Sequence, residues 1–537
     1  MTEQTDVAIP KESSAWAPFG NAPFAVLWVA TVVSNVGTWM NDVGAGWLMT
    51  ELSPSPLVVA SVQAATTLPV FLFALLAGAI ADIVDRRKML LVVNGLLFIV
   101  VSSLAVVVFL DEMTSTMLLV FTFLIGTGAA FLAPAWQAIV PKLVPRDQLT
   151  SAIALNSMGI NVSRAIGPAL AGFLIVTIGI WSPFAVNAAS FLVILVALWW
   201  WTPPESPKGK LSPEHVGPAI VAGLRYAAGS KPLQATLLRA AAFFVFASAY
   251  WAMLPLIARQ VLDGGPTLYG VLLAAVGGGA VVGALILPLI RKRLGPDATV
   301  AAATFGTALV LTSFALIPTP VVASLASAVA GLCWIAVLST LHVSAQTALP
   351  DWVRARGLSV FLTVFFGAMS GGSLIWGQVA STFSIQTALL VAAAGAVLLI
   401  PLSGAAKLGH KTAQGLSPSG HWPEPVVTLP TAQDSGPVMI QIIYDIDPDK
   451  ADPFSALMDD LRKARRRGGG YGWTLMQDVA KPSRFVETWF EASWIAHLRH
   501  HERVSVEDQG IQDRVHAMHR GEQAPAVQHL RRASREG

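Results

Sequence analysis

The sequence predicts an all-α polytopic membrane protein, with twelve transmembrane helices in two six-helix bundles and a small α+β domain at the C-terminus. The 537 residues are 54% hydrophobic and only 12% charged, whereas about a quarter of the residues in a soluble domain are charged. Apolar runs long enough to cross about 30 Å of hydrocarbon recur along the first three quarters of the chain. About half of the charged residues follow residue 406, which indicates a membrane-embedded body and then a soluble appendage.

The chain begins with polar residues 1–20, which predict a cytoplasmic tail without a cleavable signal peptide. Twelve apolar segments follow, and we expect them to form an N-terminal bundle over 21–202 and a C-terminal bundle over 234–406. The predicted transmembrane segments are 22–50, 56–80, 89–110, 115–140, 150–177, 181–202, 234–258, 267–290, 298–318, 321–346, 356–380 and 385–405.

The loops between these segments alternate in charge. One set contains Arg86, Arg87, Lys88, Lys142, Arg146, Lys208, Lys210, Arg225, Lys231, Arg291, Lys292, Arg293, Arg354 and Arg356. The other set contains Glu51, Asp111, Glu112 and Asp263, with Arg259 as its cation. Because positively charged loops stay in the cytoplasm, we predict a multi-pass protein of the bacterial inner (cell) membrane with both termini in the cytoplasm.

The longest connection inside the membrane body, residues 203–233, is predicted to be a cytoplasmic linker between the bundles. Four prolines between Pro203 and Pro213 prevent a continuous helix. Residues 216–228 then predict a short amphipathic helix along the inner surface. Two bundles joined in this way are expected of two related halves around a central cavity.

The part of the chain after the bundles has the pattern of a soluble domain. Residues 407–436 are rich in Gly, Pro, Ser and Thr and are predicted to be a linker. Residues 437–520 predict the order strand, helix, strand, strand, helix, which favours a small α+β sandwich. Residues 521–537 are predicted to be a disordered tail.

The connection between the second and third segments carries a specific motif, Gly78-x-x-x-Asp82-x-x-Asp85-Arg86-Arg87. Its cations alone would only set topology. The spacing resembles the signature of major facilitator transporters, in which Asp82 and Arg86 match residues of the cytoplasmic gate. Asp85 stands where that family usually has glycine.

The same resemblance implies a latch on the cytoplasmic side. We expect Asp82 to cap or pair near the start of the eleventh span, where Arg354 and Arg356 lie. The pair would form when the cavity faces outward and break when it faces inward.

Two ionisable residues lie inside predicted spans, Asp42 in the first and Arg164 near the middle of the fifth. Charge in hydrocarbon is costly, so such residues face a cavity or a partner. Our hypothesis is that Asp42 takes up a proton while Arg164 tunes its proton affinity or binds an anionic substrate group. The alternative is a structural ion pair or an outer-gate contact. Further candidate cavity donors, each of which could instead bond a neighbouring helix, are Asn35, Gln63, Asn161 and Gln378.

The fifth segment contains Gly167-Pro168-x-x-Ala171-Gly172, which resembles the span-five signature of major facilitator exporters. Residues 134–146 and 152–157 resemble the subgroup of transmembrane secretion effectors that contains bacterial siderophore exporters. The resemblance covers most of residues 20–405 and implies efflux of a siderophore-like, drug-like or amphipathic molecule. Many proton-driven relatives carry an arginine in span four, but residues 118–140 contain no cation, so Arg164 is a candidate substitute.

The C-terminal domain resembles ferredoxin-like domains of the antibiotic biosynthesis monooxygenase type, which usually pair as dimers. Its sequence includes His497, His500, His501, His516 and His519. Because no cysteine or carboxylate set completes a ligand spacing, we interpret these histidines as a solvated surface and predict no metal and no cofactor.

The sequence therefore predicts a secondary active exporter that works by alternating access as a proton antiporter, and not an enzyme. No Gly-x-x-x-x-Gly-Lys-Ser/Thr motif supports ATP as the driving force. The expected partners are a small-molecule substrate, protons and the lipid bilayer, and the net charge of +3 is too small to indicate nucleic acid. Two alternatives stay open for the C-terminal domain: a fused monooxygenase for a polyketide-like substrate, or a sensing or dimerisation module that forms a homodimer.

Overall fold

The computed structural model describes residues 14–202, 216–404, 406–408, 413–423, 425 and 435–531. The chain forms two compact units. The first unit contains the described residues before 203 together with 238–341 and 362–406. The second contains 216–237, 342–361 and the described residues from 407 onward.

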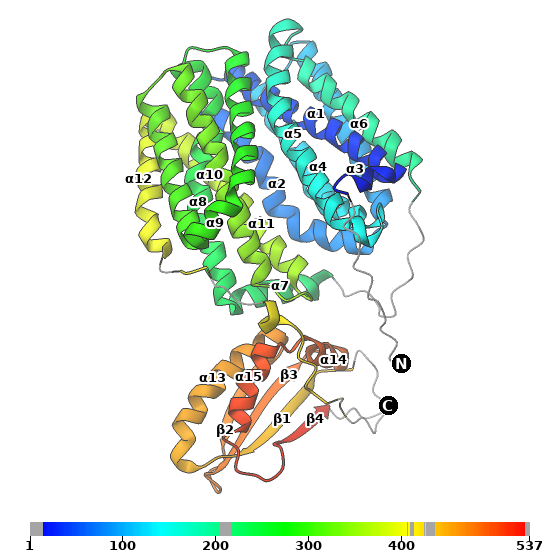
Figure 1. Ribbon diagram of the computed structural model, residues 1–537, viewed down its shortest axis with the longest axis vertical. Coiled ribbons are helices and arrows are strands. Elements are labelled where there is room, and N and C mark those ends of the chain that lie inside the picture. The colour runs from blue at the N-terminus through cyan, green and yellow to red at the C-terminus, as the bar shows by residue number, and fades with distance from the viewer. Residues whose placement is uncertain are drawn as a thin grey trace, which may run out of the picture. The chain divides into compact units, whose positions relative to one another are not determined.

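The N-terminal half of the first unit is helical throughout (Figure 1). Two caps fix helix starts: the Asp85 carboxylate accepts a bond from the Lys88 amide, and the Thr114 hydroxyl accepts one from Met117. Proline in the first turn starts the second and sixth helices. The helices are α1 (Ala22–Leu52), α2 (Pro56–Ile83), α3 (Arg86–Phe109), α4 (Ser115–Ile139), α5 (Leu149–Thr177) and α6 (Ser182–Trp200).

The C-terminal half continues with helices that overlap the predicted segments. They are α8 (Lys231–Leu256), followed by a π turn (Ile257–Val261), α9 (Pro266–Leu316), α10 (Pro320–Thr347), α11 (Arg354–Thr382) and α12 (Ile385–Gly404). Among the described residues, ten helices are long and apolar enough to cross a membrane, and Ile385–Pro401 is a shorter apolar helix.

The longest helix, α9, is interrupted at Gly295. Its 51 residues would extend about 76 Å at about 1.5 Å per residue, more than twice the hydrocarbon thickness. Gly295 has φ 72° and ψ 172°, a conformation that glycine adopts without the steric cost other residues incur, and Pro296 follows it. The break separates 266–294 from 296–316, which correspond to the predicted segments 267–290 and 298–318.

The second unit contains a four-stranded antiparallel sheet in the order β2-β3-β1-β4. Helices cover one face of the sheet (Figure 1). The core between them contains the buried strand residues Ile440, Ile442, Tyr444 and Trp489, together with Phe454 from the covering helix Ala451–Gly468. Besides the helix α7 (Val216–Gly229), its elements are β1 (Val438–Asp445), α13 (Ala451–Gly468), β2 (Tyr471–Gln477), β3 (Arg484–Glu491), α14 (Trp494–Arg503), α15 (Val506–His516) and β4 (Ala526–Arg531).

Two sequence-based boundaries of this unit are wrong. The predicted disordered tail contains β4, because residues 526–531 pair with the open edge of β1; their side chains are mostly exposed and give no apolar alternation. The predicted linker 407–436 is also not all linker. Ser419 bonds Val504, and the Trp422 indole donates to the Gln512 amide oxygen at 2.8 Å, so residues 413–423 pack on the domain.

Buried charges hold the interior of this domain together. Glu487 is fully buried and accepts bonds from Arg465 Nε at 3.2 Å, Trp473 Nε1 at 2.9 Å and the Tyr444 hydroxyl at 2.9 Å. The Arg465 guanidinium lies 4.4 Å from the centre of the Trp489 ring. Every oxygen of the carboxylate thus has a donor, as a buried charge requires.

Candidate functional site

A cavity of about 210 Å³ lies inside the first unit and is lined by helices of both halves. Three residues proposed from the sequence meet there: Asp42 of α1, Gln63 of α2 and Arg164 of α5. The C-terminal half contributes side chains from α8, α9, α10 and α11. A cavity whose wall changes when one half moves against the other is the arrangement that alternating access requires.

The charged groups of the cavity are not paired with each other. Between the described residues, no ion pair joins Asp42 to Arg164, so the structural ion pair proposed as an alternative does not form in this conformation. The Arg164 guanidinium lies 5.4 Å from the centre of the Trp39 ring. Its buried Nε has no hydrogen-bond partner among the described residues. A buried donor of this kind is costly unless a ligand or water completes it.

Aromatic side chains that were not predicted from the sequence form the wall of the cavity on the side of the C-terminal half. Trp251 of α8 stands with its ring centre 5.2 Å from that of Trp334 of α10. Phe365 of α11 follows at 6.0 Å from Trp334 and 4.5 Å from Phe366. The indole nitrogen of Trp251 is buried without a partner among the described residues. The wall therefore offers stacking surface and one donor.

The other proposed cavity donors lie elsewhere. Asn161 donates to the Ser157 carbonyl one turn earlier on α5, at 2.9 Å. Gln378 is exposed and bonds Thr382 at 3.1 Å. Asn35 is half-buried on α1 and is not part of the cavity wall. Polar amides in a predicted span thus marked the cavity in only one of four cases, Gln63.

The Gly167-Pro168-x-x-Ala171-Gly172 motif brings α5 into close contact with two helices. A Cβ at Gly167 would lie 2.6 Å from Cβ of Trp39, so the glycine sets the position of that cavity residue. A Cβ at Gly172 would lie 2.8 Å from the carbonyl oxygen of Pro266 at the start of α9. Small residues that allow such approach are typical of helix contacts in membranes.

A polar contact joins the two halves near the ends of α1 and α8. Arg259 Nη1 donates to the Thr50 hydroxyl at 3.0 Å, and its guanidinium lies 5.6 Å from the Trp47 ring centre. The Trp47 indole in turn donates to the Glu51 carboxylate at 2.8 Å. Arg259 thus binds two residues of α1 across the interface between the halves.

The gate motif organises the turn between α2 and α3. Asp85 caps α3 through the Lys88 amide, and Arg87 donates to the carbonyls of Leu198 at 2.9 Å and Trp199 at 2.6 Å at the end of α6. Arg86 donates to the Ala81 carbonyl at 3.3 Å, and Gly78 lies within α2.

The expected latch stays a prediction, because the side chain of Asp82 lies outside the described residues. One of its expected partners, Arg354, pairs with Asp351 at 2.5 Å.

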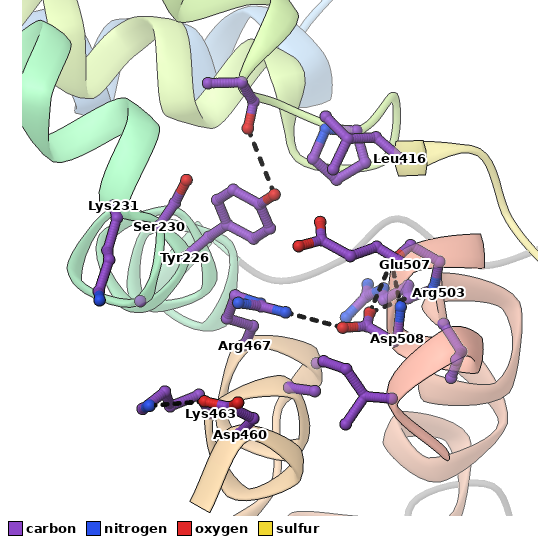
Figure 2. Close-up of a pocket in the computed structure, with 18 of the residues that line it drawn as sticks. Tyr226, Ser230, Lys231, Leu416, Asp460, Lys463, Arg467, Arg503, Glu507 and Asp508 are labelled. Atoms are coloured by element: carbon purple, nitrogen blue, oxygen red, sulfur yellow. Dashed lines mark hydrogen bonds and ion pairs between the residues drawn. The ribbon is translucent and has the colours of Figure 1, made fainter. Parts of the chain in front are cut away.

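A second pocket, of about 480 Å³, lies within the second unit (Figure 2). It lies where α7, the turn around 348–352, α13 and α15 meet. Arg467 bonds Asp508 at 2.7 Å, and the Tyr226 hydroxyl donates to the Ala348 carbonyl at 3.3 Å. These bonds connect the soluble domain's own helices and fasten α7 to the turn at 348–352.

Relatives of known role are transporters. The chain is 25% identical over 360 residues to the staphyloferrin A transporter of Staphylococcus aureus, covering 65% of this chain and 87% of the relative. It is 24% identical over 299 residues to macrolide efflux protein A of Streptococcus pyogenes, covering 55% and 73%. It is 26% identical over 295 residues to the enterobactin exporter EntS of Escherichia coli, covering 53% and 68%.

Solved structures and a family profile complete the comparison. The fold is similar to the nucleoside transporter NupG, with a TM-score of 0.60 and 13% identity over 72% of this chain and 99% of that one. A bacterial homologue of the lysosomal transporter Spinster, in an inward-facing conformation, gives a TM-score of 0.53 and 16% identity over 72% and 96%. Because the profile described as transmembrane secretion effector matches residues 13–537, the chain belongs to this family of major facilitator exporters.

Proposed function

We propose that this transporter exports a planar, amphipathic small molecule that carries an anionic or carbonyl group, and that it exchanges the molecule for protons by alternating access. The observation that supports this most directly is the cavity itself, in which Asp42, Arg164 and an aromatic wall meet between the halves. The aromatic wall suits stacking against a flat molecule. The unsatisfied donors of Arg164 and Trp251 suit an acceptor group.

The relatives support this substrate class. Their names refer to staphyloferrin A, enterobactin and macrolides, which makes siderophore-like and drug-like molecules the first candidates here. The cargo leaves the cytoplasm when the cavity opens to the other side, and the Arg259–Thr50 contact breaks at that step.

Asp42 is the proposed proton carrier. It lines the cavity without a cationic partner among the described residues, so it can take up a proton from whichever side the cavity faces. Arg164 then serves the substrate rather than the carboxylate. In this scheme Arg164 takes the place of the arginine that many proton-driven relatives carry in span four.

We infer twelve membrane crossings in the bacterial inner membrane, with both termini in the cytoplasm. The ten long apolar helices, the break of α9 at Gly295 and the shorter helix Ile385–Pro401 support this count. The break follows Arg291, Lys292 and Arg293, whose charges favour a cytoplasmic turn.

The export function is tested by comparing metabolites and added dyes in cytoplasm and medium, in cells that contain the protein, lack it, or carry the Arg164→Ala variant at equal expression. We expect at least one acidic aromatic compound to accumulate inside cells without the protein and inside cells with Arg164→Ala. If every compound is distributed equally between cytoplasm and medium in all three strains, the proposal is rejected.

A second function, regulation of transport by the C-terminal domain, is supported by the composition of the second unit. That unit combines the domain with α7, which lies between the two halves in sequence, and with the α10–α11 connection. Arg225 of α7 donates to the Gly469 carbonyl at 3.0 Å, and Arg503 lies 4.4 Å from the Trp352 ring centre. Through these contacts the domain restrains α7 and the α10–α11 connection, and a change in the domain would alter that restraint.

The regulatory proposal has a direct test in the full chain. Arg225→Ala with Trp352→Ala should change the transport rate while leaving substrate KM unchanged, because neither residue lines the cavity of the first unit. Val479→Ala, at a fully exposed turn, is the control. A double variant that transports like the control would leave the domain without this role.

A further inference from the structure

Three histidines that are separated in sequence meet in the C-terminal domain. His497 and His501 lie one turn apart on α14, so their side chains share one face of the helix. His529 comes from β4, where it pairs with Ile440 of β1. One ring nitrogen from each histidine can be chosen so that all three lie within 4.8 Å of one another.

The sheet register explains why His529 reaches the helix. Ile440 points into the core beneath the helices, and directly paired residues of an antiparallel sheet point to the same face. His529 therefore faces α14, and its ring centre lies 4.7 Å from that of His497. The strand that carries His529 falls in the region predicted as a tail, so only the helical pair could be recognised from the sequence.

These rings are unlike a solvated surface. His497 is 1% exposed, and His501 and His529 are half-buried. The Trp494 ring packs at 5.4 Å from His497 and 5.9 Å from His529, and Trp422 packs at 4.7 Å from His501. The cluster is enclosed on its sides by aromatic rings, and the two half-buried histidines leave an entry path.

Hydrogen bonding inside the domain leaves part of the cluster unsatisfied. Nε2 of His497 and Nε2 of His501 are 3.1 Å apart. Nδ1 of His497 is buried and has no partner among the described residues, whichever nitrogen carries the proton.

We propose that His497, His501 and His529 bind one divalent transition-metal ion of the borderline class, such as Zn²⁺. Three imidazoles with an open fourth position form a common zinc arrangement, and two histidines at i and i+4 on a helix are a recurrent part of such sites. Nitrogens around a tetrahedral zinc stand about 3.3 Å apart, given zinc–nitrogen bonds of about 2.0–2.1 Å. The Nε2 atoms of the helical pair, 3.1 Å apart, are already close to that spacing. A ring nitrogen of His529 lies within 4.8 Å of a ring nitrogen of each of the other two histidines.

The ion would cross-link β4 to α14. Because β4 is an edge strand with mostly exposed side chains, a bond from His529 to the helix adds a tertiary restraint that its hydrophobic contacts do not supply. Metal occupancy would then control the order of this edge of the domain.

The test uses the full-length protein in detergent, purified through a tag without histidines and stripped of metal by chelator. After dialysis against Zn²⁺, mass spectrometry of the metal should find about one ion per chain, and Co²⁺ should give visible absorption typical of nitrogen ligands. His529→Gln and His501→Gln should each lower the affinity for Zn²⁺ at least about tenfold. His516→Gln, at an exposed position on α15, should bind like the wild type.

Two further readouts on the same samples separate ligation from folding. In the wild type, Zn²⁺ should protect the three histidines from diethyl pyrocarbonate and slow amide exchange in 526–531, with no change at His516. Absence of stoichiometric binding by the wild type, or equal binding by His529→Gln and wild type, would show a stack of aromatic rings without metal.

Discussion

Gly277 of α9 lies directly against the main chain of Arg164. A Cβ at Gly277 would stand 2.7 Å from the Arg164 carbonyl oxygen and 2.9 Å from Cα of Ala165. The backbone that carries the cavity arginine is thus in contact with the other half of the transporter, without a side chain between them. We therefore expect a movement of α9 against α5 to displace the backbone of Arg164.

The contact predicts a difference between adjacent glycines. Gly277→Ala forces α5 and α9 apart, and overpacking of this kind costs about 1–3 kcal/mol. A Cβ at Gly278 meets nothing within 4 Å, so Gly278→Ala is the control. We expect only Gly277→Ala to lower the melting temperature in detergent and the transport rate. Equal melting temperatures and equal transport rates in the two variants would show that the α5–α9 contact at Gly277 plays no part in transport.

Arg164→Gln should weaken substrate binding. A hydrogen bond to a charged group contributes about 1.5–3 kcal/mol, so the KM of an anionic substrate should rise about 10- to 100-fold, and Arg164→Lys should recover part of the loss. Arg291, whose guanidinium bonds Thr340 and Ser339 of α10, supplies the control Arg291→Gln. Transport kinetics with one substrate across the three variants measure this, and an unchanged KM in Arg164→Gln would contradict substrate binding by Arg164.

Removing the buried carboxylate of the C-terminal domain should destabilise that domain. Glu487→Ala leaves Arg465 buried without its anion, which should lower the free energy of unfolding by about 3–5 kcal/mol. Glu502→Ala, at an exposed position, should change the free energy of unfolding by less than about 0.5 kcal/mol. Hydrogen exchange of β1 and β3 in the full chain reports the difference, and equal protection in the two variants would contradict the network.

The open face of the sheet predicts a homodimer. Side chains opposite the helices include Phe490, which stacks on Tyr471 at 5.8 Å, and Met476, which is 61% exposed. Phe490→Glu should convert dimers of the full chain to monomers in mass photometry, because a charge would be buried at the interface. Gln523→Glu, on an exposed turn, should leave the oligomeric state unchanged. A wild-type protein that is monomeric at all concentrations would exclude this interface.

Sequence patterns located the elements well, because a helix that crosses a bilayer must be apolar over its own length. They also brought out Asp42 and Arg164, since charge in a span is rare and must face a cavity. Both line the cavity. Gln63 joins them, whereas Asn161 bonds its own helix.

The rest of the cavity was not predictable from one sequence. In the sequence, Trp251 and Trp334 cannot be told from lipid-facing apolar residues. Only the packing of α8 against α10 brings them together in the wall of the cavity. His529 illustrates the same limit in the soluble domain. Its strand has no apolar alternation, and the pairing with β1 that places it opposite His497 is a tertiary contact.

Coupling of export to protons through Asp42 is tested most directly in proteoliposomes containing a pH-sensitive dye and the transported compound. We predict that substrate movement through the wild type drives proton movement in the opposite direction. Asp42→Asn should still exchange substrate across the bilayer but move no protons, while Asp111→Asn, at an exposed loop, behaves like the wild type. Proton movement of wild-type size in Asp42→Asn would contradict the account.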